Sequence, residues 1–336
     1  MRLSTSLHRG ILETSVGRVL NRFEIMSRRD TLFFEDILAN YVKECEKEGY
    51  GAEICTAAQK AFAILIHGLV PQTLKKSPSI FLNVFAKNIW KNIGLLDDLK
   101  VTIDGDIIKI ETMNECITRI IGQNKYAIGG FTGILNILFN SQVDLINASQ
   151  MGEYSRYTFR LQDEPFEIIE AKDKAIYNKL NHMERTEGFT LKDAIKDNFF
   201  QLKKNKIYFR GKLLWHVENT FFHIIGSQNT LLDAVPEISY DYFSSIIGED
   251  VAKDRKLILL KTLLQTLDWG IVRIAAKEGD DILLEIKNPP YGLQLEKDNW
   301  NFIYNTILGY LWTIDKRYKI KKVDESYKRL IMFFEL

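Results

Sequence analysis

The sequence predicts an α+β protein made of two similar modules, each a four-stranded antiparallel sheet covered by helices. Residues 99–114 and 273–288 resemble each other at an offset of 174, with three matching pairs: Gly105 and Gly279, Glu111 and Glu285, Asn114 and Asn288. An apolar helical pattern also recurs, as ILNILF at 134–139 and as ILGYLW at 307–312. Two strand-like segments follow each of these helices, so each module can form one sheet of four antiparallel strands.

The first module begins with two expected helices, 32–48 and 52–69, separated by Gly49-Tyr50-Gly51. A third helix is expected over 81–95, where apolar residues recur at three- and four-residue steps. A hairpin follows, and its turn lies at Asp104-Gly105-Asp106, since glycine supplies the positive φ of a tight hairpin. The helix that contains 134–139 and two strands, 143–148 and 154–161, complete the module.

The second module repeats this order. Its expected elements are helices at 213–225 and 256–269, a hairpin with its turn at Glu278-Gly279-Asp280, the helix around 307–312, and strands at 318–323 and 330–336. The chain then divides into a basic amphipathic segment (1–29), the first module (30–162), a charged helical connector (163–205) and the second module (206–336).

Composition excludes several classes of protein. The hydrophobic fraction of 46% favours buried cores over disorder, and the net charge of +1, from 45 basic and 44 acidic residues, gives no overall attraction to nucleic acid. The cysteines Cys45, Cys55 and Cys116 fit neither a disulfide framework nor a CxxC metal site. The longest apolar run, 61–71, is too short to span a bilayer. We therefore expect a soluble cytoplasmic protein, while the arginines of residues 1–29 leave an organellar targeting signal open.

No catalytic motif stands out. The sequence contains no GxSxG elbow, no Walker-type loop and no GxGxxG fingerprint, which favours a non-enzymatic role. His216 and His223 are seven residues apart, too far for the i, i+4 pair that chelates zinc in a helix, and His67 lies inside an apolar run as a core histidine would. No metal or other cofactor is expected from these residues.

Two further features have both a structural and a functional interpretation. Gly129 and Gly133 share one face of a helix, where a bare backbone permits close packing or the approach of a ligand. Arg317, Lys319 and Lys321 fall on one face of an expected strand, where they either protect a sheet edge from aggregation or contact a partner or nucleic acid.

Several short segments together carry a resemblance to a known family. These are Glu48 to Glu53 (EGYGAE), the hairpin at 98–113, the helix with Gly129 and Gly133, and the closing Gly152-Glu153-Tyr154 with Tyr157-Thr158-Phe159. Residues 30–162, and more weakly 206–336, resemble the 4-vinyl reductase-like domain, which is related to the TRAPP vesicle-tethering subunits and to haem-nitric-oxide-binding domains.

The resemblance implies a ligand-binding or dimerising α/β module, used in sensors, in accessory proteins of tetrapyrrole synthesis and in tethering scaffolds. Metal-associated members have cysteines before the glycine-bearing helix and in the final strand, where this chain has Asn124-Lys125-Tyr126 and Ser155-Arg156-Tyr157. The resemblance therefore does not bring a zinc site with it.

The leading hypothesis is a non-enzymatic sensor of a small hydrophobic molecule, or an assembly scaffold, whose two modules pair with each other and whose partner is a protein or a second copy. Candidate pocket residues are Gly129, Gly133, His67, Trp90 and Tyr126. Two alternatives stay open. One is an accessory protein or enzyme of tetrapyrrole metabolism, with haem or a pigment at His67 or His223. The other is a nucleic-acid-binding regulator that uses Arg317, Lys319, Lys321 and the N-terminal arginines.

Overall fold

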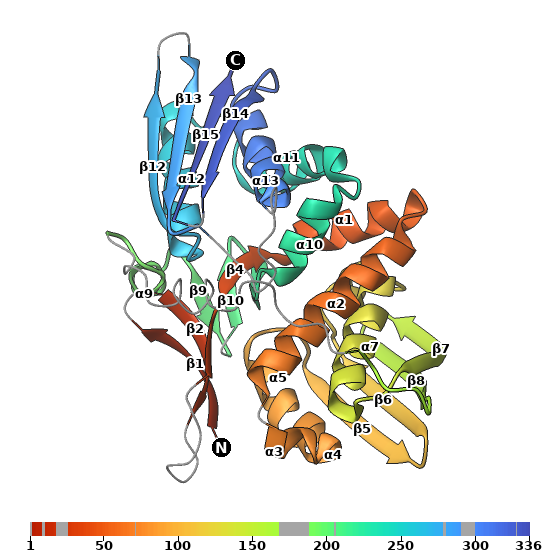
Figure 1. Cartoon of the computed structure of the whole chain (residues 1–336). Coiled ribbons are helices and arrows are strands. Elements are labelled where there is room, and N and C mark those ends of the chain that lie inside the picture. Colours follow the sequence, from red (N-terminus) through yellow and green to blue (C-terminus); the bar gives the residue numbers. More distant parts are fainter. Residues whose placement is uncertain are drawn as a thin grey trace.

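The computed structural model describes residues 2–8, 11–17, 26–70, 72–167, 188–204, 206–277, 280–289, 300–326 and 328–336, with only the backbone of residues 2–29. The predicted turn residues Glu278 and Gly279 and about half of the predicted connector, residues 168–187 and 205, lie outside the described residues. In Figure 1 one sheet lies at the top and a second at the lower right, with helices α1, α2 and α10 between them.

The first module contains the sheet β5-β6-β8-β7, all antiparallel. Its strands are β5 (Asp98–Asp104), β6 (Ile107–Met113), β7 (Val143–Met151) and β8 (Tyr154–Leu161). Buried and exposed residues alternate along β5, β6 and β8, so one face meets the helices and the other faces outward. Helix α7 (Lys125–Phe139) contacts the sheet, and α2 (Gly51–Leu69) packs against α7.

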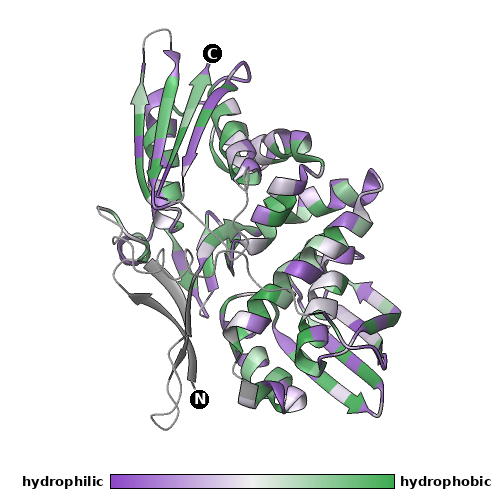
Figure 2. Cartoon of the chain, in the orientation of Figure 1, coloured by the Kyte–Doolittle hydropathy of each residue, from purple (hydrophilic) through white to green (hydrophobic). Residues whose placement is uncertain are grey.

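The second module contains a sheet of the same order, β12-β13-β15-β14. Its strands are β12 (Ile271–Ala276), β13 (Ile282–Lys287), β14 (Lys319–Ser326) and β15 (Arg329–Glu335), and its helices include α11 (Val235–Ile246), α12 (Lys253–Thr266) and α13 (Asn301–Trp312). Figure 2 shows hydrophilic and hydrophobic bands alternating along the strands of both sheets. The prediction of an α+β fold with two similar sheet-and-helix modules is confirmed.

The two modules also share a backbone detail. Asn114 and Asn288, which match in the sequence, both have positive φ angles, of 48° and 55°. In each module the N–H of this asparagine donates to a carbonyl in the turn between the last two strands, that of Glu153 (2.7 Å) or of Lys328 (2.8 Å). The second strand of each sheet therefore ends in the same way.

A third four-stranded sheet, β4-β11-β10-β9, was not predicted. It contains β4 (Thr31–Phe34), β9 (Gln201–Lys203), β10 (Lys206–Phe209) and β11 (Lys212–Val217). The helices predicted at 32–48 and 213–225 are wrong at their starts, because β4 and β11 pair with each other and bury Phe33 opposite Trp215. Each strand leads into a shorter helix, α1 (Glu35–Lys47) or α10 (Thr220–Gln228).

The remaining elements are short. They are α3 (Gln72–Lys75), α4 (Pro78–Ile80), α5 (Lys87–Asn92), α6 (Thr118–Ile121), α9 (Leu191–Lys196), the 3-10 turn η2 (Leu232–Ala234), and β1 (Arg2–His8), β2 (Ile11–Gly17) and β3 (Met26–Arg29), which form a sheet of their own. The single helix predicted over 81–95 is interrupted, because Phe81–Ala86 forms a π-helical segment, η1. Among the described residues no helix is both long and apolar enough to cross a membrane.

Aromatic side chains from both modules form one shared core. Phe33 of β4 lies 4.6 Å from Phe222 and 5.8 Å from Phe302, measured between ring centroids, and stacks on Trp269 at 5.7 Å. Tyr41 of α1 donates a hydrogen bond to the carbonyl of Thr230, at 2.6 Å. The modules are thus joined by buried apolar packing, which is the strongest contribution available to such an interface.

Candidate functional site

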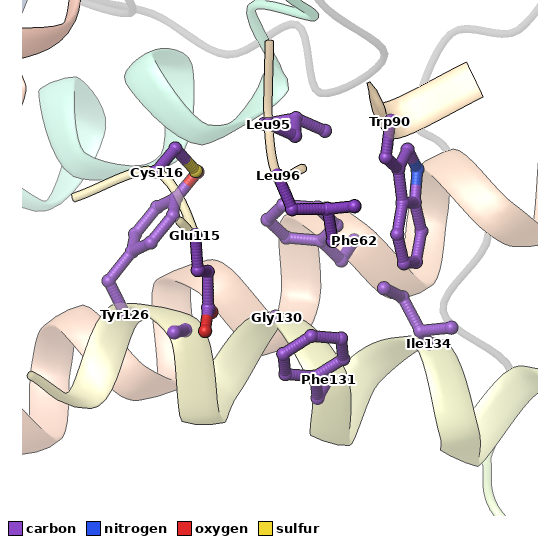
Figure 3. A pocket seen from close by; sticks show the side chains of 11 residues that line it. Phe62, Trp90, Leu95, Leu96, Glu115, Cys116, Tyr126, Gly130, Phe131 and Ile134 are labelled. Carbon is purple, nitrogen blue, oxygen red and sulfur yellow. The ribbon is translucent and has the colours of Figure 1, made fainter. Parts of the chain in front are cut away.

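A small cavity lies in the first module, between α7, α2 and the segment that follows β6 (Figure 3). The lining residues are mostly aromatic or aliphatic: Phe62, Trp90, Leu95, Leu96, Glu115, Cys116, Tyr126, Ala127, Gly130, Phe131 and Ile134. The volume of this cavity is about 40 Å³. A cavity of this size holds about three water molecules or the polar end of a small ligand.

Glu115 is the one acidic side chain among the lining residues, and it is only 5% exposed. Its Oε2 atom accepts hydrogen bonds from the hydroxyls of Thr112 (2.9 Å) and Tyr157 (2.8 Å). Burial raises the pKa of this carboxyl to about 7, although both hydroxyl donors oppose the rise. A carboxyl with this pKa can exchange a proton near neutral pH when its surroundings change.

The cavity lies where two hydrophobic clusters meet. Cys116 and Tyr126 belong to the core that both modules share, whereas Phe131 and Ile134 belong to a separate cluster inside the first module. Phe62 packs against both clusters. A molecule in the cavity would therefore contact the core of the first module and the core that joins the modules.

The chain segment that lines the cavity, Glu115 and Cys116, leads directly into a strained turn. Directly after Glu115 and Cys116, Ile117 has φ 66° and ψ −57°, and the N–H of Thr118 donates to the carbonyl of Cys116 at 2.7 Å. This is the rare form of the γ-turn, and a β-branched residue is disfavoured there. Ile117 is fully buried, so the surrounding packing holds the turn in place.

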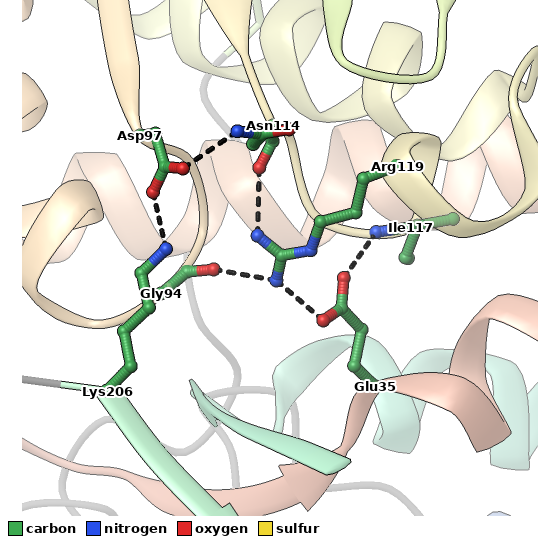
Figure 4. A network of polar contacts seen from close by, with 7 residues as sticks. All are labelled: Glu35, Gly94, Asp97, Asn114, Ile117, Arg119 and Lys206. Atoms are coloured by element: carbon green, nitrogen blue, oxygen red, sulfur yellow. Dashed lines mark hydrogen bonds and ion pairs between the residues drawn. The ribbon is translucent and has the colours of Figure 1, made fainter. Parts of the chain in front are cut away.

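The strained turn is tied to the first helix of the shared core (Figure 4). The Ile117 N–H donates to Oε1 of Glu35 at 2.9 Å, and Arg119 Nη2 pairs with Oε2 of Glu35 at 2.5 Å. Arg119 also donates to the carbonyls of Gly94 (2.9 Å) and Asn114 (2.8 Å). Both ions are largely buried, with 2% of the Glu35 side chain and 15% of the Arg119 side chain exposed.

The same network reaches the third sheet. Asn114 donates its side-chain amide to Asp97 at 2.8 Å, and Lys206 of β10 forms an ion pair with the other oxygen of Asp97. These contacts keep the pKa of the Asp97 carboxyl below its usual range, even though burial works in the opposite direction. Residues 94–119 therefore contact α1, the third sheet and the cavity at once.

The structure separates the predicted pocket residues into three places. Trp90 and Tyr126 line the cavity. Gly129 and Gly133 face the backbone of α2 instead, because a Cβ atom on either would lie 2.1 Å from the carbonyl oxygen of Cys55 or Gln59.

His67 lines a different hollow at the ends of α2 and α7. Lys75 and Lys76 lie there too, and Lys75 Nζ is 3.1 Å from the His67 carbonyl oxygen and 3.4 Å from its Nδ1 atom. A cation beside the last carbonyls of a helix is a common stabilising arrangement. It does not place His67 near the aromatic cavity.

The predicted basic strand is largely neutralised by neighbouring acids. Arg317 pairs with Asp315 (2.7 Å), and Lys321 pairs with Glu335 (3.1 Å), while Lys319 is exposed on the edge strand β14. Since two of the three cations already have acidic partners, little positive charge is left there for phosphate groups.

Sequence reasoning did not find Glu115, Cys116, Phe62 or Phe131, although one signal was present. At the offset of 174 the second copy has Pro289 where the first has Glu115. Because the neighbouring asparagine is the same in both copies but the ionisable residue is not, this residue is not required by the repeated fold.

The histidines that could hold a metal are dispersed. Burial lowers the pKa of His216 to about 4, so its ring is neutral, and His223 is buried in α10 with its ring 5.5 Å from that of Trp300. In the part of the chain that the structure describes, no three His, Cys, Asp or Glu side chains come together as metal ligands would.

Comparison of the chain with models of known protein families, with curated proteins and with solved structures finds no match.

Proposed function

We propose that this protein is a non-enzymatic small-molecule sensor, built from two modules of the 4-vinyl reductase-like type, whose ligand site is the cavity of the first module. The observation that carries the proposal is the continuity of residues 115–119. Glu115 and Cys116 line the cavity, and the next residues hold Glu35 of α1 in the shared core. A ligand that moves the first two residues acts directly on the contacts between the modules.

The strained turn at Ile117 can transmit a change in the cavity. A non-glycine residue held in a disfavoured backbone conformation stores about 1 to 3 kcal/mol of strain, which is released when the packing around it changes. A ligand shifts the equilibrium between two conformations by as much as its affinities for them differ. The hydrogen bond from Cys116 N–H to the carbonyl of Leu95, at 2.6 Å, ties two sides of the cavity to this turn.

The same modules could bind a tetrapyrrole, but no contact here favours that alternative. Neither His67 nor His223 lines the cavity, whose volume is about 40 Å³. A macrocycle would need the aromatic walls to separate widely. The size and the apolar lining support a ligand with few heavy atoms.

The experiment that tests the sensor is native purification followed by hydrogen exchange. Protein from its natural source should release a small molecule on denaturation, and the Ala127→Leu variant, whose larger side chain fills the cavity, should release none. Adding the molecule back to stripped protein should slow amide exchange in α1 as well as around the cavity. Protection that stops at the cavity wall would refute transmission, and the absence of any released molecule would refute binding.

A further inference from the structure

Among the residues that the structure describes, no Lys, Arg or His forms an ion pair with the buried carboxyl of Glu115. The side chains that contact this carboxyl, those of Thr112, Tyr157 and Ser155, carry neutral hydroxyls. The nearby guanidinium of Arg119 is already engaged by Glu35 and by two backbone carbonyls. A buried carboxylate that lacks a counter-ion favours either a proton or a bound cation.

Aromatic rings line the same hollow as this carboxyl. In Figure 3 the side chains of Trp90, Phe62, Tyr126 and Phe131 border the hollow, with Glu115 descending toward α7 among them. Ring centroids are 6.3 Å apart for Trp90 and Phe131 and 6.0 Å apart for Phe62 and Tyr126. Ring faces attract cations, and they do so more strongly where water is excluded.

We propose that the cavity binds a small organic cation, a protonated amine on a compact apolar body, whose ammonium group donates to Glu115 between the aromatic rings. This inference rests on the proposed function, because it names the ligand class of the same site. The hydroxyls of Thr112 and Tyr157 occupy Oε2, so the ammonium group meets the Oε1 side of the carboxylate. The apolar body lies against Trp90, Phe131 and the mouth of the hollow.

The pH dependence of binding follows from the groups that face Glu115. Tyr157, Tyr126 and Cys116 all have pKa values raised by burial and stay neutral between pH 6 and 8, and Arg119 forms an ion pair with Glu35. The Glu115 carboxyl loses its proton in this window, since burial places its pKa at about 7. An amine that is protonated throughout should therefore bind more tightly as the pH rises from 6 to 8.

The test compares isobutylamine with isobutyl alcohol, which have the same shape but differ in charge. Affinity is measured by NMR chemical-shift titration of the full-length protein at pH 7, and the Ala127→Leu variant identifies shifts that do not come from the cavity. We expect the ammonium form to bind at least tenfold more tightly than the alcohol. Glu115→Gln should remove this preference, while Glu111→Gln, on the outer face of the sheet, should keep it.

The outcomes separate the two proposals. If the alcohol binds in the cavity as tightly as the amine, the cation class is wrong and the small-molecule site stands. If neither probe binds at millimolar concentration, the cation class is wrong and the cavity loses its support as a ligand site. The comparison of amine with alcohol uses the wild-type protein, so it does not depend on the folding of any variant.

Discussion

Replacing Arg119 by methionine tests whether the buried ion pair with Glu35 joins the cavity segment to α1. The substitution keeps an unbranched apolar side chain but removes the guanidinium. Glu35 would then be a buried carboxylate with one remaining donor, the Ile117 N–H, and the carbonyls of Gly94 and Asn114 would each lose a donor. Three polar groups are left without the partner they have in the native fold.

The magnitude follows from measured costs of such changes. Removing one partner of a buried ion pair costs about 3 to 5 kcal/mol of the free energy of unfolding. A matched control is Arg329→Met, because Arg329 pairs with Glu285 at 2.8 Å but its side chain is 55% exposed. An exposed pair contributes about 1 kcal/mol or less, so the two variants should differ by at least about 2 kcal/mol.

Urea denaturation, followed by tryptophan fluorescence and circular dichroism, measures both variants. If the pair couples the first module to the shared core, Arg119→Met should also separate one transition into two, with the sheet β5-β6-β8-β7 unfolding first. A loss no larger than that of Arg329→Met would refute the claim that this buried pair holds the segment in place.

Two further perturbations give results that the structure predicts. Because burial raises the pKa of Glu115 from 4.5 to about 7, the folded protein keeps a proton that the unfolded chain has released. The free energy of unfolding of the wild-type protein should therefore fall by about 3 kcal/mol relative to that of Glu115→Gln as the pH rises from 4.5 to 7. Urea denaturation curves at several pH values measure both, and a difference that stays constant between pH 4.5 and 7 would contradict the raised pKa. Gly133→Ala should destabilise by about 2 kcal/mol in thermal or urea unfolding despite the higher helix propensity of alanine, because its Cβ would meet the Gln59 carbonyl oxygen at 2.1 Å. Gly130→Ala is the matched control, since its Cβ would meet only the ring of Phe62, at 3.2 Å, and equal losses for the two variants would count against close backbone packing.

The sheets of the two modules could be predicted because local patterns specify them. Alternating buried and exposed residues define the strands, and in the first module Gly105 and Gly152, both with positive φ, form the turns of the two hairpins without reference to the rest of the chain. Residues 31–34 and 212–217 could not be predicted in the same way, since they are too short to show a period and sit directly before helices. Only the pairing of Phe33 with Trp215, almost two hundred residues apart, makes them strands.

The candidate site was partly visible in the sequence. Trp90 and Tyr126 could be proposed because large aromatic residues near a glycine-bearing helix commonly line pockets. His67 attracted attention as a potential ligand, but its direction depends on the rotation of α2, which the sequence does not specify. The ion pair of Glu35 with Arg119 joins residues 84 positions apart, and no local sequence pattern predicts such a contact.

The second module suggests what occupation of the cavity would change. The buried residues of its sheet, such as Leu284 and Met332, belong to the shared core, whereas Ile108 and Phe159 of the first sheet belong to a separate cluster. At the position that matches Gly129, the second module has Phe302, whose ring enters the shared core 4.9 Å from that of Phe222. In the second module, the module's own side chains therefore fill the boundary with the shared core. The first module has a cavity at this boundary, so a small apolar cation bound there would supply the packing that Phe302 provides in the second module.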